Sequence, residues 1–210
     1  GGTITTSDYF TQFAAGAKIT GSYPLTASIT REYFAASAAR KHVDALKNTF
    51  NYYVPLSKHY QFSSSMGEKS SQALNLISIP SIFYGSSIKK GSVDLRFYVT
   101  GTMVGQLRDI NRNGDLIQVA PYGSPNSGSV AGVALYNEGF VCLTGAWAIN
   151  DRQLKYTGGT SVDQAKWLYF GVGANDGVTG SSGESTSTQT RASASFYMAF
   201  SGTHYVPNVT

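Results

Sequence analysis

Apolar and polar residues alternate strictly between residues 92 and 100, and this pattern leaves few folds open to the chain. Val93, Leu95, Phe97 and Val99 occupy every second position, and the intervening residues, from Asp94 to Thr100, are mostly polar. Because successive side chains of a strand point to opposite faces of a sheet, the pattern predicts a strand with one buried face.

The same period of two recurs along much of the remaining chain. Residues 73–79 are expected to form a strand that Pro80 ends or places at a sheet edge. Two successive hairpins are expected at 103–119 and 130–148, because Asn113-Gly114 and Gly139 supply the turn residues that tolerate positive φ.

The last third of the chain gives three further expectations. Residues 166–172 are interpreted as a buried strand, and residues 192–201 as a final long strand with alternating faces. The tract 173–190 is rich in Gly, Ser and Thr, and we expect it to be a mobile loop because it offers little apolar surface to bury.

One segment near the N-terminus departs from this pattern. Residues 30–50 contain no Gly or Pro, and apolar residues recur near the helical period at Tyr33, Ala36, Val43, Leu46 and Phe50. This spacing predicts an amphipathic helix over 31–49, with Ser28 or Thr30 as its N-cap.

Together these elements indicate a mainly β protein. Seven or eight strands joined by short turns favour an antiparallel β-sandwich with jelly-roll or Greek-key wiring, with one amphipathic helix near the N-terminus. Residues 1–55 would be an extended lead-in plus the helix, and residues 56–210 the sandwich. Because the apolar stripe of the helix needs a surface to cover, we expect one structural unit. Because the chain starts at Gly1 and not at Met, we expect it to be processed, tagged or a piece of a longer chain.

Charge and cysteine content bound the partners. The sequence has 16 Lys and Arg residues against 12 Asp and Glu residues, and the adjacent basic pairs are Arg40-Lys41 and Lys89-Lys90. These residues do not form the basic stripe that would indicate nucleic-acid binding, so we expect no nucleic acid as partner. The sequence contains no run of 18 apolar residues, so we expect no membrane span. The single Cys142 cannot form an internal disulfide, and its place in a strand pattern favours a buried structural thiol over a reactive one.

The segment Asp109-x-Asn111-x-Asn113-Gly114-Asp115 matches the first half of an EF-hand calcium loop. The second half does not match, because Ile117 and Ala120 stand where a ninth-position ligand and the bidentate glutamate belong. We therefore favour an Asx-rich hairpin turn over a calcium site.

The residues for catalysis or cofactor binding are sparse. His42, His59 and His204 have no second ligand at metal spacing, and Gly171-x-Gly173 is not followed by a helix as a dinucleotide site requires. We predict no catalytic, cofactor-binding or metal-binding residues. Glycoside hydrolysis by a pair of carboxylates is a remaining alternative, and the candidate carboxylates are Asp94, Asp109, Asp115, Glu138, Asp151, Asp163 and Asp176. Stacking on sugar rings stays open for Tyr98, Tyr122, Tyr136, Trp147, Trp167 and Tyr169.

Four stretches carry a resemblance to a known class of proteins. They are HVDALKNTFNYYVPLSKHYQFSSSMGEKSSQALNLI, IPSIFYGSSIKKGSVDLRFYVTGTMVGQLRDINRNGDLIQ, GSVAGVALYNEGFVCLTGAWAI and KWLYFGVGANDGV. This part of the chain, about residues 40–200, resembles large virion structural proteins of marine tailed bacteriophages, notably the T4-like myoviruses that infect cyanobacteria. The resemblance carries no catalytic residues over.

The resemblance implies a virion component without enzymatic activity, in the tail, neck or baseplate, assembled in the host cytoplasm. It would act by packing against copies of itself and other virion proteins, with no nucleic acid and no membrane as partner. The alternative is a module that binds host-surface glycans, and a glycan-cleaving enzyme is a third possibility.

Overall fold

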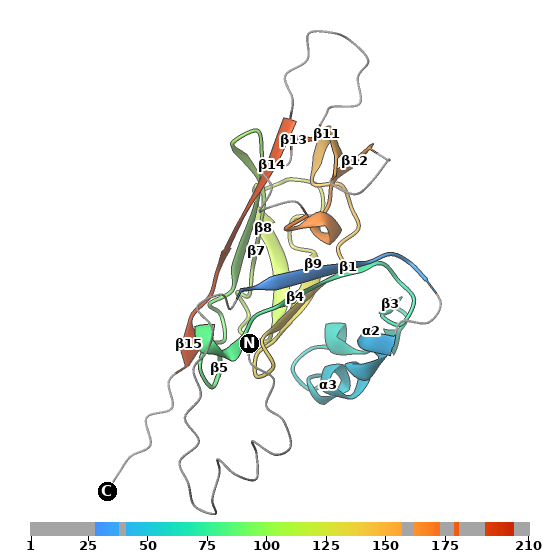
Figure 1. The fold of residues 1–210 in the computed structure, drawn as a ribbon, viewed down its shortest axis with the longest axis vertical. Coiled ribbons are helices and arrows are strands. Elements are labelled where there is room, and N and C mark those ends of the chain that lie inside the picture. Colours follow the sequence, from blue (N-terminus) through green and yellow to red (C-terminus); the bar gives the residue numbers. More distant parts are fainter. Residues whose placement is uncertain (1–27, 38–40, 157–161, 173–178, 181–191, 204–210) are drawn as a thin grey trace, which may run out of the picture.

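The computed structural model describes residues 28–37, 41–156, 162–172, 179–180 and 192–203, which form a mainly β protein (Figure 1). Its main sheet has nine strands in the order β1-β4-β10-β9-β8-β7-β6-β14-β13, and every neighbouring pair is antiparallel. The strands are β1 (Thr30–Phe34), β4 (Leu74–Ser78), β10 (Phe140–Leu143), β9 (Val130–Leu135), β8 (Asp115–Ala120), β7 (Thr102–Arg108), β6 (Asp94–Val99), β14 (Ala192–Ala199) and β13 (Thr179–Gly180).

Short elements surround this sheet. Three two-stranded ribbons pair β11 (Asn150–Lys155) with β12 (Val162–Ala165), β5 (Ser87–Ile88) with β15 (Gly202–Thr203), and β2 (Ser63–Ser64) with β3 (Gly67–Glu68). The helices are α2 (Lys41–Ala45) and α3 (Lys47–Tyr52), with 3-10 turns η1 (Lys58–Tyr60), η2 (Ser81–Phe83) and η3 (Trp167–Tyr169). No helix in the described ranges has the length and apolar character needed to cross a membrane.

The nine-stranded sheet curls into a half-barrel (Figure 1). The mainly β class predicted from the sequence is therefore confirmed. The sandwich with jelly-roll or Greek-key wiring is not confirmed, because the long strands belong to one curled sheet and do not divide into two stacked ones.

The period-two segments are confirmed as strands. In β6, Leu95, Phe97 and Val99 are buried while the residues between them are half-exposed, as the alternation predicts. Both hairpins are present as β7–β8 and β9–β10, although β10 ends at Leu143 and residues 144–148 are not part of the strand. Strand β4 ends just before Ile79-Pro80. In β14, Phe196 and Met198 are half-buried whereas Ser195 and Tyr197 are exposed.

The helix predicted over 31–49 is wrong in its first part. Residues 30–34 form the strand β1, and the helical turns begin only at Lys41, so neither Ser28 nor Thr30 caps a helix. Helix propensity is a weak preference, and pairing of the aromatic-rich segment Tyr33-Phe34 with β4 overrides it. The later part of the stripe is correct, because Val43 and Phe50 are buried and Leu46 is half-buried.

The strand predicted over 166–172 is also wrong. The segment forms the 3-10 turn η3 and then bends at Gly171, whose φ is +76°. Its apolar run comes from side chains packed into the core, where Trp167 is fully buried. A short apolar run in the sequence does not distinguish a buried strand from another kind of buried segment. Most of the predicted loop 173–190 and the lead-in before residue 28 lie outside the described residues.

One core joins the sheet to the segments that pack on it. Ala131 to Leu135 are five consecutive buried residues of β9, which requires cover on both faces of the strand. Trp167 from η3 packs edge-on against Phe97, with ring centroids 6.2 Å apart. Tyr60 from η1 donates a 2.5 Å hydrogen bond to the carbonyl of Ala134. These contacts hold the half-barrel in shape.

Candidate functional site

Asp109, the first residue of the calcium-like segment, is a buried structural hub. Its carboxylate accepts hydrogen bonds from the backbone N–H of Gly91 at 2.8 Å, from that of Gly114 at 3.1 Å, and from the hydroxyl of Tyr136. The side chain is 1% exposed. Burial raises the pKa of Tyr136 and the bond to Asp109 raises it further, so the phenol stays protonated as a donor. These contacts support the Asx-rich turn.

The end of the same segment brings Ser57, His59 and Asp115 together. Ser57 Oγ donates to Asp115 Oδ2 at 2.9 Å and lies 3.0 Å from His59 Nδ1, and that nitrogen lies 3.3 Å from Asp115 Oδ1. In a catalytic Ser-His-Asp relay, serine and carboxylate contact opposite ring nitrogens. Here both contact Nδ1, so the cluster pins η1 to the start of β8 instead of activating the serine.

No sequence signal marks this cluster, because Ser57 and Asp115 lie 58 positions apart and only the fold joins them. No carboxylate or second ligand lies near His59 at metal spacing in the chain, so the sequence predicts no site there. Nothing in its local pattern marks Asp115 as that partner.

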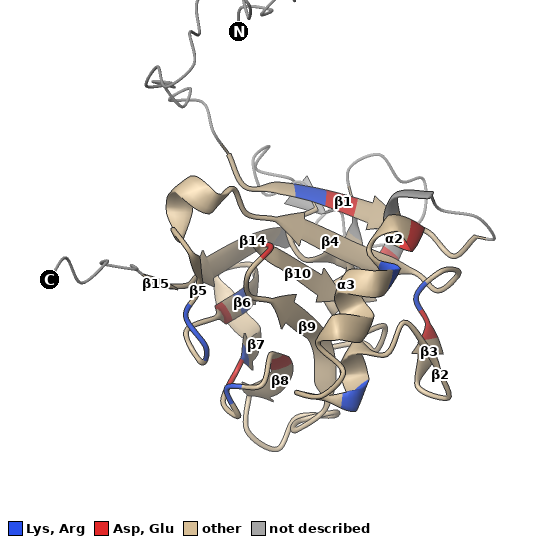
Figure 2. Ribbon diagram, turned by 90° about the horizontal axis from the view of Figure 1, so that it is seen from below, with Lys and Arg blue, Asp and Glu red and all other residues tan. Residues whose placement is uncertain are grey.

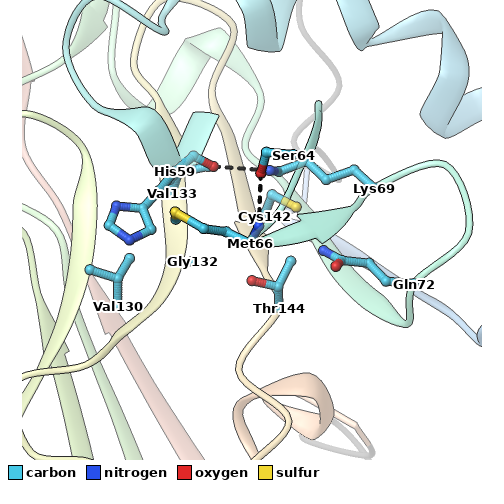
Figure 3. A pocket seen from close by; sticks show the side chains of 10 residues that line it. All are labelled: His59, Ser64, Met66, Lys69, Gln72, Val130, Gly132, Val133, Cys142 and Thr144. Atoms are coloured by element: carbon cyan, nitrogen blue, oxygen red, sulfur yellow. Dashed lines mark hydrogen bonds between the residues drawn. The ribbon is translucent and has the colours of Figure 1, made fainter. Parts of the chain in front are cut away.

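A cavity of about 180 Å³ lies between the loop that carries η1, β2 and β3 and the strands β9 and β10 (Figure 3). Lys69 reaches its wall, and its ammonium donates to the carbonyls of His59 at 2.9 Å and Gln61 at 2.6 Å. Burial lowers the pKa of Lys69. Cys142 also lines the cavity and is 1% exposed, in agreement with the predicted buried thiol. These contacts join Lys69 to residues of the same loop, so the lysine holds the loop together at the wall of the cavity.

The carboxylates named from the sequence have separate partners. Asp94 accepts from Arg96 at 2.7 Å and from Gln106 at 2.8 Å, and Asp163 accepts from Lys166 at 2.7 Å. Glu138 accepts from Tyr53 at 2.8 Å, and Asp151 is exposed. Asp176 lies outside the described residues, as do the histidine His204 and the side chain of His42. Among the described side chains, no three His, Cys, Asp or Glu residues gather closely enough to hold a metal ion.

Two of the aromatic candidates meet at a buried amide. The indole N–H groups of Trp147 and Trp167 each donate to Gln118 Oε1 at 2.9 Å, and Gln118 is 1% exposed. Tyr122, by contrast, is 99% exposed in the loop after β8. The tryptophans named as sugar platforms are therefore packed as structural residues.

The open sides of the half-barrel offer a different kind of site. Each end of a curled sheet leaves a row of backbone N–H and C=O groups that a further strand can pair with. At one end is β1, which contains Arg31 and Glu32. At the other end is β14, where residues 194–199 pair with β6 on one side, and the described residues of β13 pair with Ala192 and Ser193 on the other.

Among the described residues, the β14 edge shows none of the usual protection against pairing. Natural edge strands are blunted by charges, prolines, bulges or short length. Residues 192–203 contain no charged residue and no proline, and β14 spans eight residues. Within the described part of the chain no second strand covers Ala194–Ala199. We call Ala194–Ala199 the open edge, and it is the candidate interaction site of the molecule.

No protein-family model, curated protein or solved structure matches this chain.

Proposed function

We propose that this chain is a non-enzymatic structural component of a bacteriophage virion, in the tail, neck or baseplate, which acts by packing against copies of itself and other virion proteins. The observation that supports the proposal is the open edge of β14, which is uncharged and mostly apolar. In this proposal the mature chain resides in the virion after assembly in the host cytoplasm.

A second copy of the chain is the first partner we propose for the open edge. Two copies of this edge can pair antiparallel about a two-fold axis, because every contact of residue i in one copy with residue j in the other is repeated as j with i, which closes the interface. Absence of charge along Ala192–Thr203 removes the repulsion that would otherwise separate two such strands.

The side chains next to the edge favour such a contact. Phe196 and Met198 are half-buried, so a neighbouring strand would cover apolar surface that water now contacts. Tyr197 is 46% exposed and lies 4.9 Å from the guanidinium of Arg96. A six-residue edge is small beside a standard interface of roughly 1,600 Å², so we expect a dissociation constant in the micromolar range.

The test is sedimentation velocity of the full chain at concentrations from about 1 to 200 µM. We expect dimers or larger assemblies at the upper end. The double variant Ser195→Lys/Tyr197→Lys places two charges on the open edge and should be monomeric throughout. The matched control, Tyr122→Lys/Ser127→Lys, makes the same change on the exposed loop after β8 and should assemble like the wild type.

A wild-type chain that stays monomeric over this range, or an edge variant that assembles as well as the control, contradicts the packing proposal. The location is tested separately by mass spectrometry of purified phage particles. Peptides of this chain should be present at a fixed ratio to other virion proteins, and their absence contradicts the virion assignment.

A further inference from the structure

A groove of about 760 Å³ runs between the end of α3 and the loops beside β5. Tyr52, Tyr53 and Leu56 form one wall, and Lys89, Lys90, Ile88 and Arg112 are among the residues that form the other. Its volume falls within the roughly 300–1,000 Å³ of pockets that hold small molecules. The open edge of β14 does not line it, so any binding here is distinct from subunit packing.

Positive charge gathers on the wall formed by the loop after β5 and the turn between β7 and β8. Lys89, Lys90 and Arg112 also line an adjoining hollow of about 430 Å³, where Arg108 joins them. All four side chains are exposed, and none takes part in the ion pairs of the described residues, which join other partners. In Figure 2 the loop after β5 and the turn between β7 and β8 both carry basic segments.

The buried carboxylate of Asp109 holds the two basic turns in place. One oxygen accepts from the N–H of Gly91, next to Lys89-Lys90, and the other accepts from the N–H of Gly114, two residues after Arg112. The cations therefore stand on turns whose backbone is fixed before any ligand arrives, which lowers the entropic cost of binding. Asp109 is also the acidic residue that lines the hollow, and its three donors partly offset its charge.

The opposite wall is apolar and aromatic. Tyr52 is 73% exposed, and its ring packs edge-on against that of Tyr53 with centroids 5.5 Å apart. Tyr53 is fixed in turn by its hydrogen bond to Glu138, and Leu56 is 38% exposed beside it. An exposed tyrosine ring on a supported base is a surface on which the C–H face of a sugar ring stacks.

We propose that this groove binds an acidic glycan, with Tyr52 stacking on a sugar ring and Lys89, Lys90 and Arg112 binding its carboxylate or sulfate groups. Charge-assisted hydrogen bonds from lysine and arginine suit such anions. A nucleic acid is less well suited, because the four cations lie on two neighbouring turns and do not form a long basic stripe that could follow a phosphate backbone.

The test is calorimetric titration of the full chain with trigalacturonic acid, with the neutral trisaccharide maltotriose as the comparison. We expect trigalacturonic acid to bind with a dissociation constant of about 10 µM to 1 mM and to weaken as NaCl rises from about 0.05 to 0.5 M. Maltotriose should bind at least about tenfold more weakly, because it has no anionic group for the cations.

Variants locate the site. Lys89→Ala/Lys90→Ala should weaken trigalacturonic acid binding at least about tenfold, and Tyr52→Ala about fivefold. The matched controls are Lys47→Ala/Lys58→Ala and Tyr122→Ala, which remove exposed side chains outside the groove lining and should change affinity less than about twofold. The circular dichroism spectrum of each variant verifies its fold.

The inference is overturned by no saturable binding of trigalacturonic acid at about 10 mM, by equal binding of maltotriose, or by equal losses in the control variants. Tighter binding of single-stranded oligothymidylate than of trigalacturonic acid would overturn it in favour of a nucleic acid. The titration is repeated on the Ser195→Lys/Tyr197→Lys edge variant, so that a failure of assembly and a failure of glycan binding are observed separately.

Discussion

Replacement of Asp109 by Asn tests whether the calcium-like segment is a structural turn. The carboxylate accepts from three donors with two oxygens, Oδ1 from Gly114 and Oδ2 from Gly91 and Tyr136. An amide has a single acceptor oxygen, so in either orientation its NH₂ group faces at least one of these donors. The variant therefore loses at least one charge-assisted bond inside a site where Asp109 is 1% exposed.

The expected cost follows from these contacts. A hydrogen bond to a charged group contributes about 1.5–3 kcal/mol, and a buried donor left without an acceptor costs about 1–3 kcal/mol. Relief of the buried charge offsets part of this sum, so we expect Asp109→Asn to lower the free energy of unfolding by about 3 kcal/mol. For a chain of this length the melting temperature should fall by about 6–12 °C.

The assay is urea unfolding followed by circular dichroism. Asp151→Asn is the control, because it makes the same charge change at an exposed residue and should alter stability by less than about 0.5 kcal/mol. An Asp109→Asn variant as stable as the Asp151→Asn control would refute the hub. Addition of CaCl₂ should leave wild-type stability unchanged, and a rise with calcium would favour the metal interpretation of the segment.

Two further predictions concern the buried polar contacts of the core. Gln118→Leu removes the acceptor shared by Trp147 and Trp167 and should lower the free energy of unfolding by about 2 kcal/mol, measured by urea unfolding, and unchanged stability would contradict this account. Burial raises the pKa of both Tyr60 and Tyr136, so their contribution to stability is present below the pKa of about 10 in the unfolded chain and is lost as pH rises above it. Thermal unfolding across this range should therefore show a shallower alkaline loss in the Tyr60→Phe/Tyr136→Phe variant than in the wild type, and equal slopes would count against the argument.

The strands were predictable from the sequence where one face of the strand is buried and the other faces solvent. Leu95 and Phe97 alternate with polar residues in such a strand, and Asn113-Gly114 and Gly139 mark turns that need positive φ. Gly114 has φ of +91° and Gly139 of +71°, in agreement with the predicted turns.

Elements whose conformation depends on distant partners were not predictable. Residues 30–34 form a strand because they pair with β4, which follows about 40 positions later in the chain. Trp167 lies in a 3-10 turn because its ring packs into the core. The curl of the sheet into a half-barrel likewise arises from how the strands pair, with register shifts in β6–β7, β7–β8 and β8–β9.

The candidate sites, too, combine features that the local sequence predicts with features that depend on distant contacts. The neutral character of Ala192–Thr203 can be read directly from the sequence, but its place at the end of the sheet cannot. Lys89-Lys90 was visible as an isolated basic pair, and only the fold brings Arg112 and Tyr52 to the same groove. Sequence patterns report local structure, whereas these sites arise from contacts between segments far apart in the chain.

Hydrogen exchange along β14 tests the packing account most directly. Every second backbone N–H of Ala194–Ala199 faces away from β6, so these amides should exchange rapidly in dilute solution and become protected as the protein concentration rises through the assembly range. The Ser195→Lys/Tyr197→Lys variant should show rapid exchange at every concentration. Equally fast exchange of these amides in dilute and concentrated wild-type protein would contradict the account.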